Sequence, residues 1–251
     1  MAKLLEGKQV RDQILTELRP RIAALPRAPG LAVVLVKNPH AYTLEEQAAI
    51  YKVIAERRDM RHFLPTPVAA ETLAKILQAA HHAPSVGLMQ PWRFIRVTDI
   101  TLRKAIHKLV DAERIKTAQA IGELENTARM AEFLRLKVEG ILDCGELLVT
   151  TLCGKRDAHT FGRRTLPEMD IASVSCAIQN MWLAARAEGL GMGWVSIFDP
   201  VKLSQLLHIP NDAKPIAVLC LGHVNSFYKE PMLVETGWVT EKTVIRNVNG
   251  K

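Results

Sequence analysis

The sequence predicts an α+β fold, because helical and extended patterns both recur while the extended segments are few and widely spaced. Extended apolar runs occupy residues 30–36, 92–97, 146–153, 193–198 and 215–224. The stretches between them carry the apolar spacing of amphipathic helices. A doubly wound sheet would need strands and helices to alternate regularly, so that class is disfavoured.

The first 41 residues predict one helix and one strand. Apolar side chains recur at helical spacing across 5–25, with Pro20 as the flaw in that helix. The run GLAVVLV at 30–36 predicts a buried strand, because a Pro-Gly and an Asn-Pro dipeptide bound it.

A second helical start follows this head. Thr43 and Glu46 have the spacing of a capping box, and we expect the helix they open to run to about Arg57. Another helix is expected over 69–83, where a proline stops it, and the strand at 92–97 follows.

The second half of the chain predicts three further helical regions. Residues 101–115 and 117–140 are rich in charge, so we expect helices exposed on one face. The clearest helix has Asp170 as its expected N-cap and Gly189 as its C-cap. Its expected buried stripe is Val174, Ile178, Met181, Trp182 and Ala185. Asp199 caps a last helix that has a proline at its first position.

The composition is that of a folded protein. The chain has 251 residues, of which 48% are hydrophobic and 24% charged, which excludes disorder. No run approaches the roughly 18 apolar residues of a membrane span, and the N-terminus lacks the apolar core of a secretory signal. The four cysteines form no CxxC pair, so we expect reduced core thiols in a cytoplasmic protein and no metal site.

The charge distribution argues against nucleic-acid binding. The formal net charge is +7, and the first 41 residues hold seven basic and three acidic residues, so they carry more than half of it. The rest is only mildly basic and shows no stripe of cations that could follow a duplex. Aromatic residues make up 5% of the chain, so stacking platforms for single strands are scarce as well.

The stretch GLGMGW at 189–194 places three glycines between an expected helix and an expected strand. The dinucleotide fingerprint needs the opposite order, strand then glycines then helix, so this is not a Rossmann loop. Two interpretations stay open: a tight helix-to-strand turn, or a backbone that passes close to something flat or bulky.

The stretch ERRDMRHF at 56–63 also supports two interpretations. It is either a solvated basic helix end, in which Asp59 pairs with a neighbouring arginine, or a phosphate clamp built from Arg57, Arg58 or Arg61. In the second case Asp59 would accept a hydrogen bond or a proton from a polyol next to the phosphate.

Two other stretches are less specific. APSVGLMQPWRF at 83–94 reads as a loop before a strand, and His81-His82 reads as a solvated or capping pair on a helix end. The sequence contains no P-loop, and no Ser/His/Asp arrangement can be read from its spacing.

Residues of about 43–238 resemble the nitroreductase-like flavoproteins and, within them, the 5,6-dimethylbenzimidazole synthases. The matching segments are RRDMRHF, APSVGLMQPW, MDIASVSCAIQNMWLAARAEGLGMGWVSIF, LCLGHV and EPMLVETGW. An ordinary nitroreductase typically has a serine where this chain has Asp59, and it does not usually carry GWVSIF.

The resemblance implies an antiparallel-rich sheet flanked by helices, in an interlocked homodimer that binds flavin at the subunit interface. The arginine cluster would contact the phosphate and ribityl end, and the loop with Ser85 would line the flavin partly from the partner subunit. The implied flavin-contacting residues are Arg57, Arg58, Asp59, Met60, Arg61, Ser85, Met89, Gln90, Gly193, Trp194, Val195 and Ser196.

The resemblance also implies a reaction in which flavin mononucleotide (FMN) is the substrate. Reduced FMN reacts with O2 and is cut to 5,6-dimethylbenzimidazole, the lower ligand of vitamin B12, and erythrose 4-phosphate. Asp59 and Ser196 are the implied catalytic residues. We expect the neighbouring arginines to lower the pKa of Asp59 and keep it ionised, so that it can accept a proton from the ribityl chain.

Two other functions stay open. An NAD(P)H-dependent nitro- or quinone reductase would recycle its FMN, and a non-catalytic flavin-binding protein would bind it without product. The source of reducing equivalents is open too, and a separate NAD(P)H-dependent flavin reductase is one candidate.

The domain organisation follows from these resemblances. Residues 1–41 resemble the extreme N-terminus of methylenetetrahydrofolate dehydrogenase/cyclohydrolase, but the chain departs before the catalytic Tyr-x-x-x-Lys of that family, so we expect no folate activity. Residues 42–251 form the expected flavin domain, whose last 13 residues depart from the family pattern. We expect the head to be loosely packed or to extend onto a neighbour, because its apolar strand lacks obvious partners.

Overall fold

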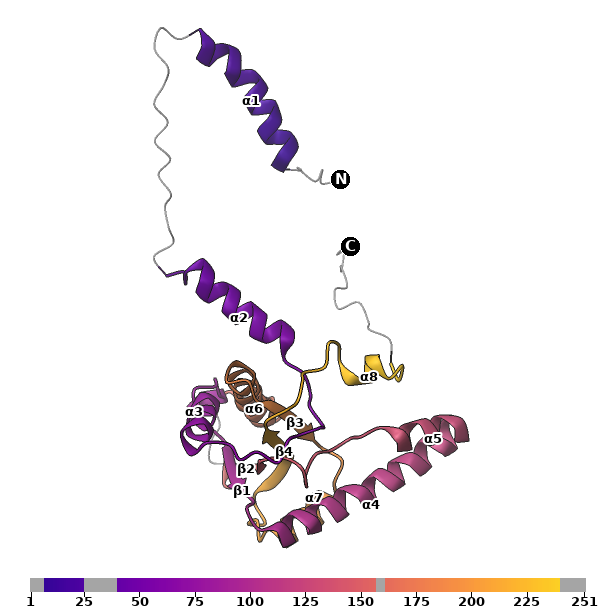
Figure 1. Cartoon of the computed structure of the whole chain (residues 1–251). Coiled ribbons are helices and arrows are strands. Elements are labelled where there is room, and N and C mark those ends of the chain that lie inside the picture. The colour runs from indigo at the N-terminus through magenta and orange to yellow at the C-terminus, as the bar shows by residue number, and fades with distance from the viewer. Residues whose placement is uncertain (1–6, 25–39, 157–160, 240–251) are drawn as a thin grey trace. The chain divides into compact units, whose positions relative to one another are not determined.

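A computed structural model describes residues 7–24, 40–156 and 161–239 of the chain (Figure 1). The chain divides into two compact units, Met1–Leu44 and Glu45–Lys251. In the first unit, helix α1 spans Gly7–Ala23 and contains Pro20 in its last turn. The strand expected at 30–36 lies outside the described residues, as does the divergent C-terminal tail.

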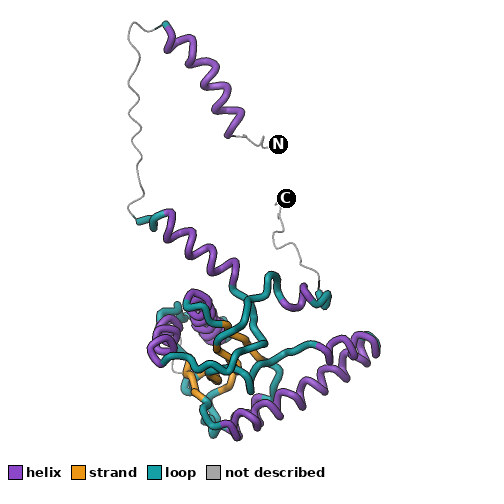
Figure 2. Tube along the Cα trace, viewed as in Figure 1, coloured by secondary structure: helices purple, strands orange, loops and turns teal. Residues whose placement is uncertain are grey.

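In the described part of the second unit, four strands form one antiparallel sheet (Figure 2). They are β1 (Trp92–Arg96), β2 (Glu146–Leu152), β3 (Gly191–Val195) and β4 (Lys214–Gly222). The order across the sheet is β1-β2-β4-β3, with every neighbouring pair antiparallel. The antiparallel-rich α+β fold expected from the sequence is therefore confirmed.

Two hydrophobic cores lie on the two faces of this sheet, because alternate residues of each central strand point in opposite directions. Leu148 of β2 and Leu219 of β4 join one core, together with residues of α3 (Ala70–His81) and α6 (Met169–Ala187). Val149 and Val218 join the other core, together with α4 (Ile100–Leu124) and α7 (Pro200–Leu206). The central strands are thus covered on both faces (Figure 1).

The remaining described elements are helical. Helix α2 spans Leu44–Glu56 and begins directly after Thr43, as the capping pattern predicts. The short elements are η1 (Val86–Leu88), α5 (Thr127–Arg135) and α8 (Met232–Glu235). No helix in the described part of the chain is long and apolar enough to cross a membrane.

The boundary between α4 and α5 differs from the sequence prediction of helices at 101–115 and 117–140. The first helix continues to Leu124, and the second starts only after Asn126, whose side chain accepts a hydrogen bond from the Arg129 amide. Thr117 does not cap a new helix, because its hydroxyl donates to the Glu113 carbonyl one turn earlier at 2.8 Å, so the first helix continues past residue 116.

Asp170 is not the N-cap that its position predicts, because α6 starts at Met169 after Glu168. The Asp170 carboxylate is buried and receives hydrogen bonds or ion pairs from Arg156 at 2.9 Å and Arg163 at 3.2 Å. The C-terminal end behaves as predicted, since Gly189 has a φ of 75° directly after the helix.

The cysteines are all free thiols, but they are not all in the core. Cys144 and Cys220 are buried, Cys153 is half-buried and Cys176 is exposed. The expectation of four core thiols therefore holds for two of them.

Candidate active site

A cavity of about 410 Å³ lies between a charged wall and an apolar wall. The charged wall consists of Arg57, Arg58, Asp59 and Arg61, continued by residues 194–197 at the end of β3. The apolar wall consists of Phe133 of α5, Leu136, Val138 and residues 231–233 and 238–239. The volume is in the range of small-molecule sites.

The charged wall is attached to the sheet through residue Met60. The Met60 amide donates to the Met192 carbonyl at 3.0 Å, and Asp59 and Met192 form an isolated parallel bridge. The Met60 side chain points into the protein and is 1% exposed. Met60 therefore fixes the position of the wall without lining the cavity.

The glycines of β3 make this attachment possible. A Cβ atom on Gly193 would lie 2.3 Å from the Met60 carbonyl oxygen, and one on Gly191 would lie 2.4 Å from Val224 and 3.0 Å from the Met60 side chain. The bulky neighbour that the glycine pattern predicts is thus a segment of the protein itself. The strand also begins at Gly191, before the predicted 193–198 range, because these glycines already pair with β4.

The Asp59 carboxylate is held by two groups. Its Oδ2 accepts a hydrogen bond from Arg61 Nη2 at 2.5 Å, and its Oδ1 accepts one from the Trp194 amide at 3.0 Å. Arg61 Nη2 also donates to the Trp194 carbonyl at 3.0 Å. The backbone N–H and C=O of one β3 residue, Trp194, therefore orient both members of the ion pair.

The pKa of Asp59 is raised above its ordinary value, so the expectation that the neighbouring arginines would produce a net lowering is wrong. Burial is the largest influence and raises the pKa, because protein atoms crowd the carboxyl although 42% of its side-chain surface is exposed. Arg61, the Trp194 amide and Arg57 act in the opposite direction without reversing the shift.

Arg58 and Arg61 already have partners. Arg58 donates to the carbonyls of Ala55, Arg57 and Lys229, all within 2.8 Å, so it ties the end of α2 to the segment after β4. Arg61 holds Asp59 and the Trp194 carbonyl. The interpretation in which Asp59 pairs with a neighbouring arginine therefore describes Arg61.

Arg57 differs from the other two arginines. Its guanidinium lies 4.5 Å from the ring centroid of Trp182 and makes no hydrogen bond with the described residues. Burial lowers its pKa, with Asp59 opposing that effect. Arg57 is therefore the cation of this wall whose hydrogen-bonding capacity is open to a ligand.

Ser196 lies in the cavity lining immediately after β3. It is exposed, and its hydroxyl makes no hydrogen bond with the described part of the protein. Trp194 and Val195 also contribute to the lining, whereas Gly193 does not.

The structure does not bring Ser85, Met89 and Gln90 to this cavity. The Ser85 hydroxyl accepts a hydrogen bond from the Gln90 amide at 3.0 Å, which closes a tight loop after α3. Met89 and Gln90 line a separate depression of about 760 Å³ beside α3 and β1. Their expected contact with flavin from a partner subunit stays a prediction.

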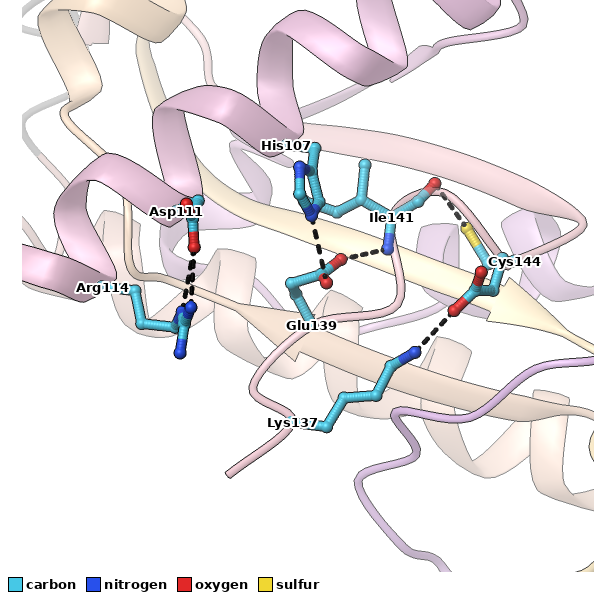
Figure 3. A network of polar contacts seen from close by, with 8 residues as sticks. His107, Asp111, Arg114, Lys137, Glu139, Ile141 and Cys144 are labelled. Atoms are coloured by element: carbon cyan, nitrogen blue, oxygen red, sulfur yellow. Dashed lines mark hydrogen bonds and ion pairs between the residues drawn. The ribbon is translucent and has the colours of Figure 1, made fainter. Parts of the chain in front are cut away.

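A polar groove of about 390 Å³ lies on the other side of the apolar wall, and Leu136 and Val138 border both spaces. In this groove His107 of α4 lies 3.5 Å from Glu139, whose other oxygen accepts a hydrogen bond from the Ile141 amide at 2.6 Å (Figure 3). These contacts hold the segment that carries the wall against α4.

The apolar wall was not predicted from the sequence. Trp238 packs against Phe133 with ring centroids 5.9 Å apart, and Arg129 of α5 lies 3.4 Å from the Trp238 ring centroid. Apolar residues of this kind cannot be distinguished from core residues in a sequence. The tryptophan at the end of EPMLVETGW was the available signal.

Comparison with known proteins identifies the class to which this fold and cavity belong. The model of the nitroreductase family matches residues 54–223, and the chain belongs to this family. The structure of an iodotyrosine deiodinase bound to FMN and 3-iodo-L-tyrosine has a similar fold, with a TM-score of 0.64 and 20% identity over 80% of this chain and 100% of that one.

Curated relatives indicate a narrower group. A 5,6-dimethylbenzimidazole synthase of Rhodospirillum rubrum is 39% identical over 188 residues, which are 74% of this chain and 87% of the relative. A 5,6-dimethylbenzimidazole synthase of Rhodobacter capsulatus is 35% identical over 191 residues, which are 76% of this chain and 90% of that relative.

Proposed function

We propose that the protein catalyses the O2-dependent fragmentation of reduced FMN to 5,6-dimethylbenzimidazole and erythrose 4-phosphate, which supplies the lower ligand of vitamin B12. The names of relatives that are 39% and 35% identical over most of both chains support this reaction. The structural observation that carries it is the Asp59 carboxylate in a cavity lining that also contains the open cation of Arg57 and the open hydroxyl of Ser196.

The cavity fits such a molecule at both ends. Arg57 offers guanidinium donors to a phosphate, since its side chain lines the cavity and makes no hydrogen bond with the described residues. The opposite wall, with Phe133 and Trp238, offers apolar surface to a planar ring. A molecule with an anionic polyol at one end and an aromatic ring at the other matches this division.

When bound, reduced flavin supplies the electrons for O2 and is itself the molecule that is cleaved. Cleavage of a bond within the ribityl chain requires removal of a hydroxyl proton, and Asp59 is the base for that step. Its raised pKa makes it a stronger base than an ordinary aspartate, while its carboxylate form still predominates at a pH above that value. Arg61 and the Trp194 amide keep the carboxylate in one orientation.

Two other features serve the reaction. The Ser196 hydroxyl can donate a hydrogen bond to the ring edge. The apolar wall excludes water from the reacting atoms, and an oxidation in a flavin site needs that exclusion to avoid uncoupled loss of reducing equivalents.

The proposal includes the assembly and the supply of substrate. A homodimer would bring Ser85, Met89 and Gln90 of the partner subunit to the flavin, and a separate NAD(P)H-dependent flavin reductase would deliver it reduced. The protein acts in the cytoplasm, and the 1–41 head contributes no folate activity.

The test is a reaction of protein with anaerobically reduced FMN, started by air-saturated buffer and analysed by mass spectrometry for 5,6-dimethylbenzimidazole. The product should form with the parent protein and should be nearly absent with Asp59→Asn and Ser196→Ala. Intact FMN that survives many rounds of NAD(P)H oxidation would indicate a nitro- or quinone reductase instead. Binding without product or turnover would indicate a non-catalytic flavin-binding protein.

A further inference from the structure

Trp182 lies behind the charged wall of the cavity rather than in its lining. It belongs to α6, its side chain packs in the core shared with α3, and it is 8% exposed. A buried tryptophan on a helix usually serves the core alone. Two contacts with the charged wall distinguish this one from the other buried apolar residues of α6.

The first contact is with the Arg57 side chain and the second is with the backbone next to it. The Arg57 guanidinium carbon lies 4.5 Å from the Trp182 ring centroid, which is cation–π distance. The indole Nε1 donates a hydrogen bond to the Arg58 carbonyl at 3.1 Å. One side chain therefore contacts the Arg57 guanidinium and holds the peptide group that joins Arg58 to Asp59.

The ring is itself supported. It packs against Trp194 with centroids 6.3 Å apart and an interplanar angle of 45°. Trp194 is the residue whose backbone N–H and C=O bind Asp59 and Arg61. The two tryptophans thus connect the open cation of the cavity with its carboxylate.

This support matters because the Arg57 side chain makes no hydrogen bond with the described residues, so the contact with the Trp182 ring is what holds it. A free arginine side chain loses rotamer freedom when it binds an anion, and a ring that holds it beforehand removes much of that cost. Burial lowers the pKa of Arg57, which means that its charged form needs a favourable contact in place of lost water.

We propose that Trp182 is a positioning residue that presets Arg57 for the phosphate monoester of the substrate, so that it determines the preference for FMN over riboflavin. This rests on the proposed function only in taking flavin as the ligand. The two molecules differ by the phosphate, so their relative affinity isolates the contribution of Arg57.

The experiment measures the dissociation constants of oxidised FMN and of riboflavin by quenching of flavin fluorescence. Trp182→Leu removes the ring, Trp182→Phe keeps an aromatic face but removes the Nε1 donor, and Ile178→Val is the control. Ile178 is fully buried on the same helix and in the same core, and it takes no part in the contacts of Trp182 with Arg57 and Arg58. Thermal unfolding of each variant establishes that it is folded.

In Trp182→Leu we expect FMN to bind roughly tenfold more weakly and riboflavin to change less than about twofold, as loss of a partly desolvated cation–π contact implies. Trp182→Phe should retain part of the preference for FMN over riboflavin. If Trp182→Leu does not fold, the comparison of Trp182→Phe with the parent protein is the test. Ile178→Val should leave the ratio of the two constants unchanged.

If Trp182→Leu weakens the binding of FMN and riboflavin equally, or leaves the dissociation constant of FMN unchanged, Trp182 serves only the core and the proposal is overturned. A parent protein that binds both flavins equally would overturn it as well. These constants do not depend on turnover. A parent that prefers FMN but forms no 5,6-dimethylbenzimidazole would therefore defeat the proposed reaction and leave the role of Trp182 standing.

Discussion

Replacement of Asp59 by asparagine removes the group proposed to accept a proton but keeps the local structure around it. Asparagine keeps an oxygen that can accept the Trp194 amide hydrogen bond, which measures 3.0 Å with aspartate, and Arg61 keeps its bond to the Trp194 carbonyl. What is lost is the base. Removal of a general base typically lowers a rate by a factor of about 10² to 10⁴, so we expect a loss of that size in 5,6-dimethylbenzimidazole formation.

The same substitution has a predictable effect on stability. The folded-state pKa of Asp59 lies above its unfolded value, so its carboxyl stabilises the fold when it is protonated, below the unfolded pKa. That stabilisation is lost as the pH rises through the folded pKa. Asparagine stays neutral at every pH, so near neutral pH the variant should unfold at the same temperature as the parent or slightly above it.

The assay is a single turnover in which enzyme and reduced FMN are mixed rapidly with O2, quenched and analysed for product. In the parent the rate should rise with pH through the raised pKa of Asp59 and then level, because the ionised form is the base. In Asp59→Asn the residual rate should lack that rise. A variant that retains the parent rate, or the parent pH profile, would show that Asp59 is not the base.

Three further expectations concern the surroundings of this carboxylate and the head. Gly193→Ala should destabilise the protein by about 1–3 kcal/mol in denaturant unfolding, because the new Cβ would lie 2.3 Å from the Met60 carbonyl oxygen; a midpoint equal to that of the parent would contradict the tight contact. Arg58→Ala should lower the free energy of unfolding, since it removes the hydrogen bonds to three carbonyls, while Arg57→Ala should weaken FMN binding with little change in stability. The reverse pattern in paired melting and binding measurements would refute this division between the two arginines. Limited proteolysis should cleave within residues 1–41 before the flavin domain, and a head that resists cleavage as long as the rest would show that it is docked.

Much of the fold follows from local pattern. Leu148 and Val149 point into different cores, so β2 is covered on both faces, and a short continuous apolar run is what predicted this strand. The pattern failed where a distant contact decides the outcome. Gly191 belongs to a strand although glycine disfavours strands, because Met60 occupies the space that a side chain would need. Asp170 resembles a cap, but its partners are arginines of a preceding loop.

The candidate site was predictable to a similar degree. The resemblance indicated both Asp59 and Ser196, and the structure places them in one cavity. The direction of the Asp59 pKa shift was not predictable, because the number of nearby arginines can be read from a sequence whereas burial cannot. The apolar wall was missed for a related reason, since Phe133 and Trp238 are far apart in the chain and meet only in the folded protein.

The contact between Met60 and the β3 glycines ties the Asp59 carboxylate to a strand of the central sheet. Helical parts near the surface can loosen on warming without shifting that group, since its anchor is a strand edge. Heat should therefore abolish turnover in the same narrow temperature interval in which the sheet itself melts, with no earlier inactive but folded stage.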